Sequence, residues 1–481
     1  MNIVTLLEEL VNSLIVAEDT FFQNPKDFYS LEKSVKSTTE AFSASFLGNV
    51  LTSMNEKIYE DGWRKNKYTV QRTDKRTLIS SVGDITFEST YFRSKADGRH
   101  HYLVEEILGL DKQERFTEEA EVILLTEALK TSYSEATKVL PSKQEISKTT
   151  VMNKIHGIAN EIPVLERAHK KNCKYLFIEA DEDHVAEQHG RWTPTEVNSS
   201  FISKLAYVYE YKQEHPKCKA KKELVNTFYF GGVYSGAEGT EKFWNNVKDY
   251  ICKTYNEDEL KRIFISGDGA PWIKSGAKYL DKALFCTDKF HLMKYINAAS
   301  RQMLDESEPA KSEIYKMLYK RDKQGIKEYT EQMMVSAPNP KPIQDLQTFV
   351  LGNWSAVMRT YHNKVITGCS AEGHVSHILS DRLSSRPMGW SKTGADRMSK
   401  LRCYEKNHGR EKIIDLVQYS RQQRKLAKTG TDNVEPVQVT LREIRTEHYN
   451  QARSYIDRIQ ATIPDGTVRK IASIREQIRL I

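Results

Sequence analysis

Three acidic residues have the types and positions that metal-dependent chemistry requires. Asp181 and Asp268 each follow a short apolar run, at residues 174–180 and 262–267, and Glu372 opens a helix-like segment far downstream. Short runs rich in β-branched and aromatic residues are typical of buried strands. Carboxylates at the tips of core strands are costly to desolvate unless a positive charge lies between them. The pattern therefore predicts bound divalent cations such as Mg²⁺, which prefer carboxylate oxygens and, in pairs, catalyse in-line phosphoryl transfer.

The residues next to these acids fit the same chemistry. If the two strands are neighbours in a mixed sheet, both aspartates emerge at one edge of that sheet. Asp183 lies two residues beyond Asp181, on the same face of a continuing strand, and is its rival as the first ligand. Gly267 and Gly269 flank Asp268, so that a phosphate or another backbone segment can approach it closely.

A histidine follows the second acid. Asp288 and His291 are three residues apart, so a helix beginning there would place them on one face. His291 could orient a catalytic carboxylate or bind a phosphate, and capping or core packing is the ordinary alternative.

Other catalytic chemistries fit the sequence less well. Glu372, His374 and His377 suggest a zinc hydrolase, but the spacing is not HExxH and no third ligand of the right type follows. No Walker loop, dinucleotide fingerprint or nucleophile-elbow serine is present. The six cysteines form no CxxC pair, which argues against a zinc ribbon and a disulfide framework. A tyrosine or serine recombinase is conceivable with 24 tyrosines, and it would form a covalent protein–DNA adduct.

Two segments carry side chains suited to nucleic acid. Helical segments at residues 116–130, 134–140 and 147–160 predict a helix-turn-helix, with Ser147 as the N-cap of the last helix. The tip of that helix offers groups that a recognition helix presents to a major groove, namely Lys148, Thr149, Thr150, Asn153 and Lys154. The second segment offers phosphate-binding and base-stacking groups, namely Arg382, Arg386 and Trp390. Residues 381–428 hold thirteen Lys or Arg against five Asp or Glu, which favours a polyanion partner or, about equally, a solvated face.

Bulk composition predicts a soluble chain of several domains. The 481 residues carry a net charge of +7, with 39% hydrophobic and 28% charged residues. No apolar stretch approaches the roughly 18 residues of a membrane span. The N-terminus lacks the basic region of a secretory signal. We therefore expect a cytoplasmic protein that makes no membrane contact.

The order of elements predicts an α/β core between helical regions. The expected core has a mixed sheet with flanking helices, from strands near residues 174–181, 204–211, 224–234, 262–266 and 284–286. An α+β N-terminal region contains a hairpin that turns at Gly83 and Asp84. The predicted divisions are an N-terminal helical and hairpin domain (1–110), the helix-turn-helix region (111–170), the first part of the core (171–290), an all-helical insertion (291–368), the last core helix with a basic segment that includes a polar loop at 384–394 (369–428), and a helical tail (429–481).

Several sequence motifs of this chain occur together in a known protein family. They are Phe-Ile-Glu-Ala-Asp-Glu-Asp-His-Val at 177–185, Gly-Asp-Gly-Ala-Pro-Trp-Ile-Lys at 267–274, Asp-Lys-Phe-His-Leu-Met-Lys-Tyr at 288–295 and Gly-Cys-Ser-Ala-Glu-Gly-His-Val-Ser-His at 368–377. The last continues through residues 382–390, and the hairpin at 82–87 matches as well. With these motifs the chain resembles the ISLre family of bacterial insertion-sequence transposases, long grouped as an uncharacterised protein family. The resemblance extends along most of the chain.

The resemblance implies a DDE transposase with a ribonuclease-H-like catalytic core. Asp181, Asp268 and Glu372 would be the metal-binding triad, and Asp288 with His291 would match a C/D-x-x-H signature of related transposases. Two Mg²⁺ ions, for which Mn²⁺ can substitute, would support cleavage at insertion-sequence ends and strand transfer into target DNA. The implied partners are both DNAs and further copies of the chain, as a dimer or higher oligomer associated with the nucleoid. The alternatives are a nuclease on the same core without strand transfer, and a non-catalytic helix-turn-helix DNA-binding protein.

Overall fold

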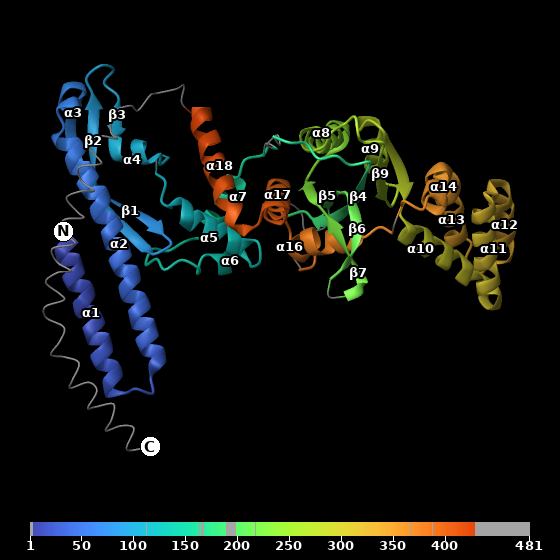
Figure 1. Ribbon diagram of the computed structural model, residues 1–481, viewed down its shortest axis with the longest axis horizontal. Helices are drawn as coiled ribbons and strands as arrows, with labels where there is room; N and C mark the ends of the chain where they lie inside the picture. Colours follow the sequence, from blue (N-terminus) through green and yellow to red (C-terminus); the bar gives the residue numbers. More distant parts are fainter. Residues whose placement is uncertain are drawn as a thin grey trace. The chain divides into compact units, whose positions relative to one another are not determined.

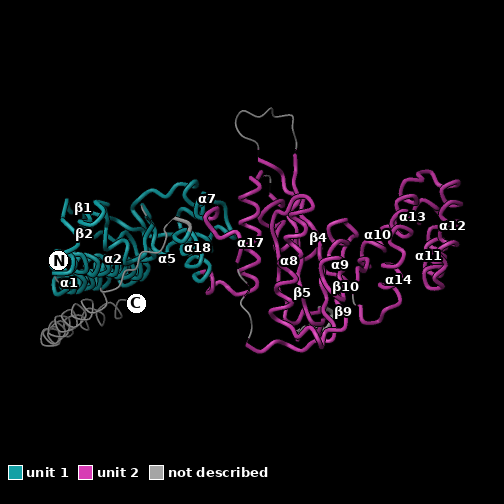
Figure 2. The backbone as a smooth tube through the Cα atoms, turned by 90° about the horizontal axis from the view of Figure 1, so that it is seen from above, with its two compact units in different colours: residues 1–154, 414–481 teal, residues 155–413 magenta. Residues whose placement is uncertain are grey.

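The computed structural model describes residues 3–428 apart from 112, 163, 165–167, 189–198, 217, 367 and 387. The chain divides into two compact units (Figure 2). The first contains the residues up to Lys154 together with the segment from Ile414 onward, and the second contains Ile155–Ile413. The predicted helical tail at 429–481 lies outside the described residues.

The first unit begins with helices, as predicted, and continues into a three-stranded antiparallel sheet (Figure 1). The elements are α1 (Ile3–Gln23), α2 (Phe28–Glu60), α3 (Gly62–Lys67), β1 (Tyr68–Ser80), β2 (Gly83–Ser94) and β3 (His100–Tyr102). The turn between β1 and β2 lies two residues earlier than predicted. Ser80 pairs with Gly83, so Ser81 and Val82 form the turn and Gly83, with a φ of 119°, opens β2.

The rest of the first unit is helical. Its elements are α4 (Leu103–Leu108), α5 (Glu118–Ala128), α6 (Tyr133–Ala136), α7 (Lys148–His156, whose last two residues fall in the second unit) and most of α18 (Ile413–Lys428). The prediction of Ser147 as an N-cap is confirmed, because its Oγ accepts a hydrogen bond from the backbone N–H of Thr150 at 3.1 Å. α18 is fastened to α5 by Arg421, which donates two hydrogen bonds to Oε2 of the buried Glu121.

The second unit is built on the predicted mixed sheet. Its strands are β4 (Tyr175–Ala186), β5 (Ser200–Tyr209), β8 (Phe228–Gly232), β9 (Arg262–Gly267) and β10 (Ala283–Thr287), in the order β10-β9-β4-β5-β8. β4, β5 and β8 are antiparallel neighbours, and β9 and β10 run parallel to β4. The predicted strand at 224–234 is two strands, because β7 (Cys218–Val225) instead pairs with β6 (Tyr211–His215) in a separate hairpin.

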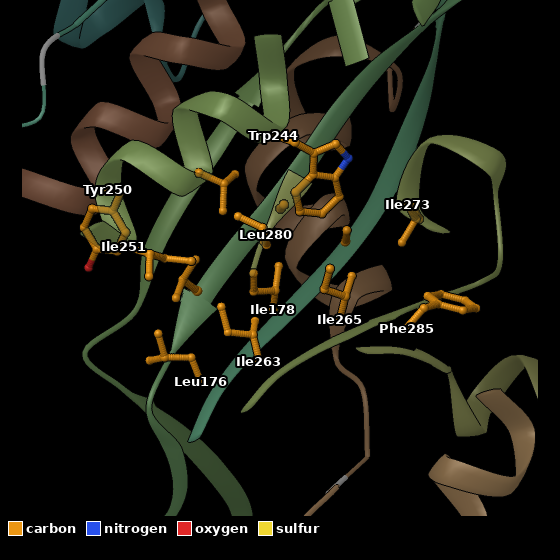
Figure 3. Packing of buried hydrophobic residues seen from close by; sticks show 14 of the residues in the cluster. Leu176, Ile178, Trp244, Tyr250, Ile251, Ile263, Ile265, Ile273, Leu280 and Phe285 are labelled. Atoms are coloured by element: carbon orange, nitrogen blue, oxygen red, sulfur yellow. The ribbon is translucent and has the colours of Figure 1, made fainter. Parts of the chain in front are cut away.

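One face of this sheet is covered by α8 (Gly236–Thr254) and α9 (Pro271–Tyr279) (Figure 3). Leu176 and Ile178 of β4 and Ile263 and Ile265 of β9 share this core with Trp244 of α8. Side chains alternate between the two faces of a strand. Phe177 and Phe264 therefore belong to the opposite face, where they pack near Cys286 and Ile366.

After β10 the chain forms the predicted helical insertion, whose helices span residues 289–362. Its helices are α10 (Lys289–Ser300), a 3₁₀ helix (Arg301–Glu306), α11 (Ser307–Lys320), α12 (Lys323–Ser336), α13 (Lys341–Gly352) and α14 (Trp354–His362). They pack around a hydrophobic core of their own, which includes Ile296, Ile314, Leu346 and Val350. The insertion is thus a folded body rather than a long loop.

The chain then returns to the sheet through α15 (Ala371–Val375), a π-helical turn (Ser376–Ser380) and α16 (Asp381–Leu383). α17 (Lys392–His408) and a 3₁₀ turn (Arg410–Lys412) follow. The predicted polar loop at 384–394 ends three residues early, because Ser391 caps α17 by accepting from the N–H of Gly394 at 3.1 Å. In the described parts of the chain, no helix is both long and apolar enough to cross a membrane.

Candidate functional site

The register of the sheet brings Asp181 and Asp268 to the same level. β4 pairs with β9 in parallel up to Glu179 and Ser266, so two further residues on each segment place Asp181 beside Asp268. β4 continues to Ala186, so Asp181 lies within the strand rather than at its end as predicted, while Asp268 directly follows β9. By alternation, both side chains belong to the face opposite α8 and α9.

The two aspartates affect each other electrostatically. The pKa of Asp181 is raised to about 6, chiefly by burial and in part by the negative charge of Asp268. A hydrogen bond from the backbone N–H of Glu182 to Asp181 Oδ1, 2.9 Å long, and the nearby His291 act in the opposite direction. The pair is therefore a partly buried site of excess negative charge.

A third aspartate lies at the same level and orients the predicted histidine. Asp288 follows β10, and its backbone N–H donates to the carbonyl of Gly267 at 2.9 Å. It caps α10 through Oδ1, while Oδ2 lies 3.0 Å from Nδ1 of His291. This hydrogen bond raises the pKa of His291, and the charges of Asp288, Asp181 and Asp268 raise it further. The predicted pairing of Asp288 and His291 is confirmed, and His291 lies near both aspartates.

Glu372 is carried toward the same face but remains apart from the pair. It is an exposed residue of α15, a helix that packs against β4. Among the residues that the structure describes, no three His, Cys, Asp or Glu side chains lie close enough together to hold a metal ion. The structure thus brings together Asp181, Asp268 and His291, and it leaves Glu372 on a neighbouring segment.

Asp183, the rival of Asp181, has a different environment. It is buried, and its Oδ1 accepts hydrogen bonds from Ser380 at 2.9 Å and Ser384 at 2.7 Å. Within the described part of the chain, its Oδ2 has no hydrogen-bond partner. These contacts attach the segment after α15 to the end of β4. Asp183 thus has one carboxylate oxygen engaged by two serines, whereas Asp181 lies beside Asp268.

The residues of α7 that are predicted to contact DNA differ in their exposure and in their contacts within the protein. Lys148, Thr149 and Asn153 are exposed, and Thr150 shares a hydrogen bond with Ser147 at 3.0 Å. Lys154 instead forms ion pairs inside the first unit, at 2.7 Å to Glu114 and 3.1 Å to Glu121. Lys154 therefore anchors α7 to the unit in this structure.

The second predicted DNA-binding segment also contains both buried and exposed side chains. Arg382 and Trp390 are both buried, and the guanidinium carbon of Arg382 lies 4.8 Å from the centre of the Trp390 ring. The backbone of Trp390 is hydrogen-bonded to Ala186 and Gln188 at the end of β4. Arg386 is exposed. In this structure Arg382 and Trp390 hold the segment in place, and Arg386 is the residue free to meet a ligand.

Sequence reasoning missed Glu179, which is the most heavily hydrogen-bonded acid near the site. Its carboxylate interacts with Tyr207, Tyr209, Lys212 and Ser370. The one signal in the sequence was a glutamate within an otherwise apolar strand, two residues before Asp181. A buried acid at such a position needs partners.

Comparison with known proteins gives the chain a family. The family described as "Uncharacterised protein family (UPF0236)" matches residues 22–420, a range that contains Asp181, Asp268 and Glu372. The chain belongs to the UPF0236 family. Two UPF0236 proteins of Caldanaerobacter subterraneus subsp. tengcongensis are similar to it. One is 34% identical over 413 residues, covering 85% of this chain and 83% of the relative. The other is 35% identical over 380 residues, covering 78% and 73%.

Among solved structures, the UPF0236 chain is similar to the "Drosophila P element transposase strand transfer complex". The likeness covers 65% of this chain and 82% of that chain, at 10% identity and a TM-score of 0.20. A TM-score this low establishes no common fold.

Proposed function

We propose that this protein is a DDE transposase, which cleaves DNA at the ends of an insertion sequence and joins the freed ends to target DNA. The observation that carries the proposal is the level placement of Asp181 and Asp268 on neighbouring parallel segments, with the pKa of Asp181 raised to about 6. Perturbed carboxylates held together in this way are typical of functional sites.

The topology of the second unit supports a ribonuclease-H-like core. Three antiparallel strands, β4, β5 and β8, come first, and β9 and β10 are added parallel to β4 on its other side. The first strand is thus central and carries the first acid, as that core requires. The helical insertion between β10 and α15 separates the second acid from Glu372 in sequence.

The donor set fits divalent cations. Asp181 and Asp268 supply hard carboxylate oxygens on one face, and the repulsion between them is relieved by a cation. We propose that Asp181, Asp268 and Glu372 hold Mg²⁺, with Mn²⁺ able to replace it. When bound, such ions activate the attacking oxygen and stabilise charge on the oxygen that leaves.

The chain's own groups would prepare the phosphate for attack. His291 is fixed by Asp288 and its pKa is raised, so it favours the protonated form, which can donate a hydrogen bond to a phosphate oxygen. Hydrolysis of one phosphodiester frees a 3′-hydroxyl, and that hydroxyl then displaces a 3′-oxygen of the target strand. Exposed cations such as Lys148 and Arg386 would neutralise DNA phosphates. Because two ends must be joined together, the working form would be a dimer or larger.

The names of the relatives also support a mobile gene. One UPF0236 name covers eleven gene loci of a single strain, and another covers four loci of the same strain. Repeated loci in one genome are expected of a sequence that inserts copies of itself.

A strand-transfer assay tests the proposal. The DNA that flanks the gene would be prepared as pre-cut ends and incubated with the protein, Mg²⁺ and a supercoiled plasmid. We expect joined products from the wild type and none from Asp268→Asn or Glu372→Gln, with DNA binding retained. Asp345→Asn is the matched control, because Asp345 is an acid of the helical insertion that lies 2.9 Å from Lys341 on the same helix. Cleavage without joining would mean a nuclease, and joining by both site variants would refute the assignment.

A further inference from the structure

A buried acid two residues before Asp181 connects the segments that carry the proposed metal ligands. Glu179 lies on β4, on the same face as Asp181, and is only 1% exposed. Its Oε2 accepts hydrogen bonds from the backbone N–H of Ser370 at 2.6 Å and from the Ser370 hydroxyl at 3.0 Å. Ser370 immediately precedes α15 and lies two residues before Glu372. One carboxylate thus joins the strand of the first ligand to the helix of the third.

The Glu179 carboxylate is itself held from several sides. Tyr207 and Tyr209 of β5 donate to it, the latter at 2.7 Å, and Lys212 of β6 pairs with Oε1 at 2.7 Å. Lys212 also donates to the carbonyl of Gly368, in the same segment as Ser370. Burial alone would raise the pKa of Glu179, but Lys212 and these hydrogen bonds together lower it. The acid therefore stays ionised and accepts every one of these bonds.

α15 has a second attachment on the other side of Glu372. Nδ1 of His374 lies 3.0 Å from the hydroxyl of Tyr229. The ring of His374 also lies against Tyr207, with the two ring centres 4.4 Å apart. Ser370 and His374 are thus fixed two residues before and two residues after Glu372, while Glu372 itself is exposed.

We propose that Glu179 is a positioning residue that sets the place of Glu372 relative to Asp181. We call Glu179 together with the groups that connect it to the segment before Glu372, namely Tyr207, Lys212 and Ser370, the Glu179 clamp. The inference rests on the proposed function, because it assigns the clamp to the metal site of that function. Each ligand lies two residues from the clamp, about 7 Å along a strand or 3 Å along a helix. A loosened clamp therefore releases α15 from β4, so that Glu372 no longer has a fixed place relative to Asp181.

The inference predicts weaker metal binding without loss of either proposed ligand. Groups that orient metal ligands typically contribute 10- to 100-fold to metal affinity. We expect a variant without the clamp to bind Mn²⁺ roughly 10- to 100-fold more weakly. We also expect the backbone amides of residues 368–376 to exchange with deuterated water at least several-fold faster.

The test uses a double variant, Glu179→Gln with Lys212→Met, in the full-length protein. Removing both charges avoids leaving one buried ion without its partner, a change that would strongly destabilise the unit. Tyr209→Phe is the matched control. It removes one hydroxyl bound to Glu179 but keeps both bonds to Ser370. Mn²⁺ binding is measured by calorimetry and amide exchange by mass spectrometry, so neither readout requires catalytic turnover.

Three outcomes are distinct. Weaker Mn²⁺ binding with faster exchange at 368–376 in the double variant, and near wild-type behaviour in Tyr209→Phe, supports the clamp. Wild-type Mn²⁺ affinity in the double variant overturns it while leaving the proposed function intact. If the wild type binds no Mn²⁺, or binds it equally well after Asp268→Asn, the proposed metal site fails and the clamp inference falls with it.

Discussion

Replacing Asp181 with asparagine should stabilise the protein when no divalent ion is bound. The ordinary pKa of an aspartate is 3.8, and burial together with the charge of Asp268 raises that of Asp181 to about 6. The difference of about two units corresponds to about 3 kcal/mol at about 1.4 kcal/mol per unit. This energy is the penalty that the folded state bears for an ionised Asp181.

The penalty depends on pH in a defined direction. Below about pH 4 the carboxyl is protonated in the folded and unfolded chains, so it costs nothing. As the pH rises through 4 to 6, the unfolded chain ionises first, and stability is lost. Above pH 6 the folded chain bears the full penalty. Asp181→Asn should therefore raise the free energy of unfolding by up to about 3 kcal/mol at pH 8 and change it little at pH 4.

Urea unfolding in the presence of a chelator measures this difference. Four of the five tryptophans that the structure describes, at positions 244, 272, 354 and 390, lie in the second unit, so their fluorescence reports mainly on the unit that contains Asp181. Glu179→Gln is the control with the opposite sign. It lies on the same strand face, but its loss leaves Lys212 buried without its partner and should cost about 3 kcal/mol or more. Excess Mg²⁺ should stabilise the wild type and not Asp181→Asn. An Asp181→Asn protein that is no more stable than the wild type at pH 8 would refute the reasoning.

Three further predictions concern other parts of the molecule. Lys148→Ala should weaken DNA binding and reduce its salt dependence by about one charge. Lys154→Ala should mainly destabilise the first unit, because Lys154 is paired with two glutamates. Filter binding at several salt concentrations distinguishes the two variants. Gly276→Ala should destabilise the second unit by about 1–3 kcal/mol in urea unfolding, since an added Cβ would lie 2.6 Å from the Trp244 ring, and an unchanged midpoint would contradict this packing. Arg421→Met should loosen α18 by leaving the buried Glu121 with Lys154 as its remaining cation partner among the described residues, seen as faster protease cleavage near residue 413 with no change in Mg²⁺ binding.

The order of elements could be read from the sequence because local patterns determine it. The apolar runs before Asp181 and Asp268 are short and bounded, and the amphipathic helices between them have clear periods. Local rules also located the Ser147 cap. Local rules failed where pairing between strands determines how far a strand extends. β4 continues past Asp181 because β5 pairs with it as far as Ala186, and no local feature of residues 182–186 indicates this.

The candidate site could be predicted only in part for the same reason. Residue types alone suggested Asp181, Asp268 and Glu372, but only the register shows that the first two are level. The position of Trp390 depends on backbone bonds to Ala186 and Gln188, and that of Lys154 on Glu114 and Glu121, all in segments distant in sequence. The partners of Glu179 lie up to 191 residues away, so no window of sequence contains them.

The hydrogen bonds between Glu179 and Ser370 also set a limit on when the protein can become active. Ser370 lies more than three quarters of the way along the 481-residue chain, beyond the whole helical insertion. During synthesis, the sheet from β4 to β10 and the insertion can fold long before residue 370 has left the ribosome. A translation product that stops within the insertion would carry both aspartates yet lack Glu372. Such fragments would keep the central strands but lack the third acid of the proposed metal site.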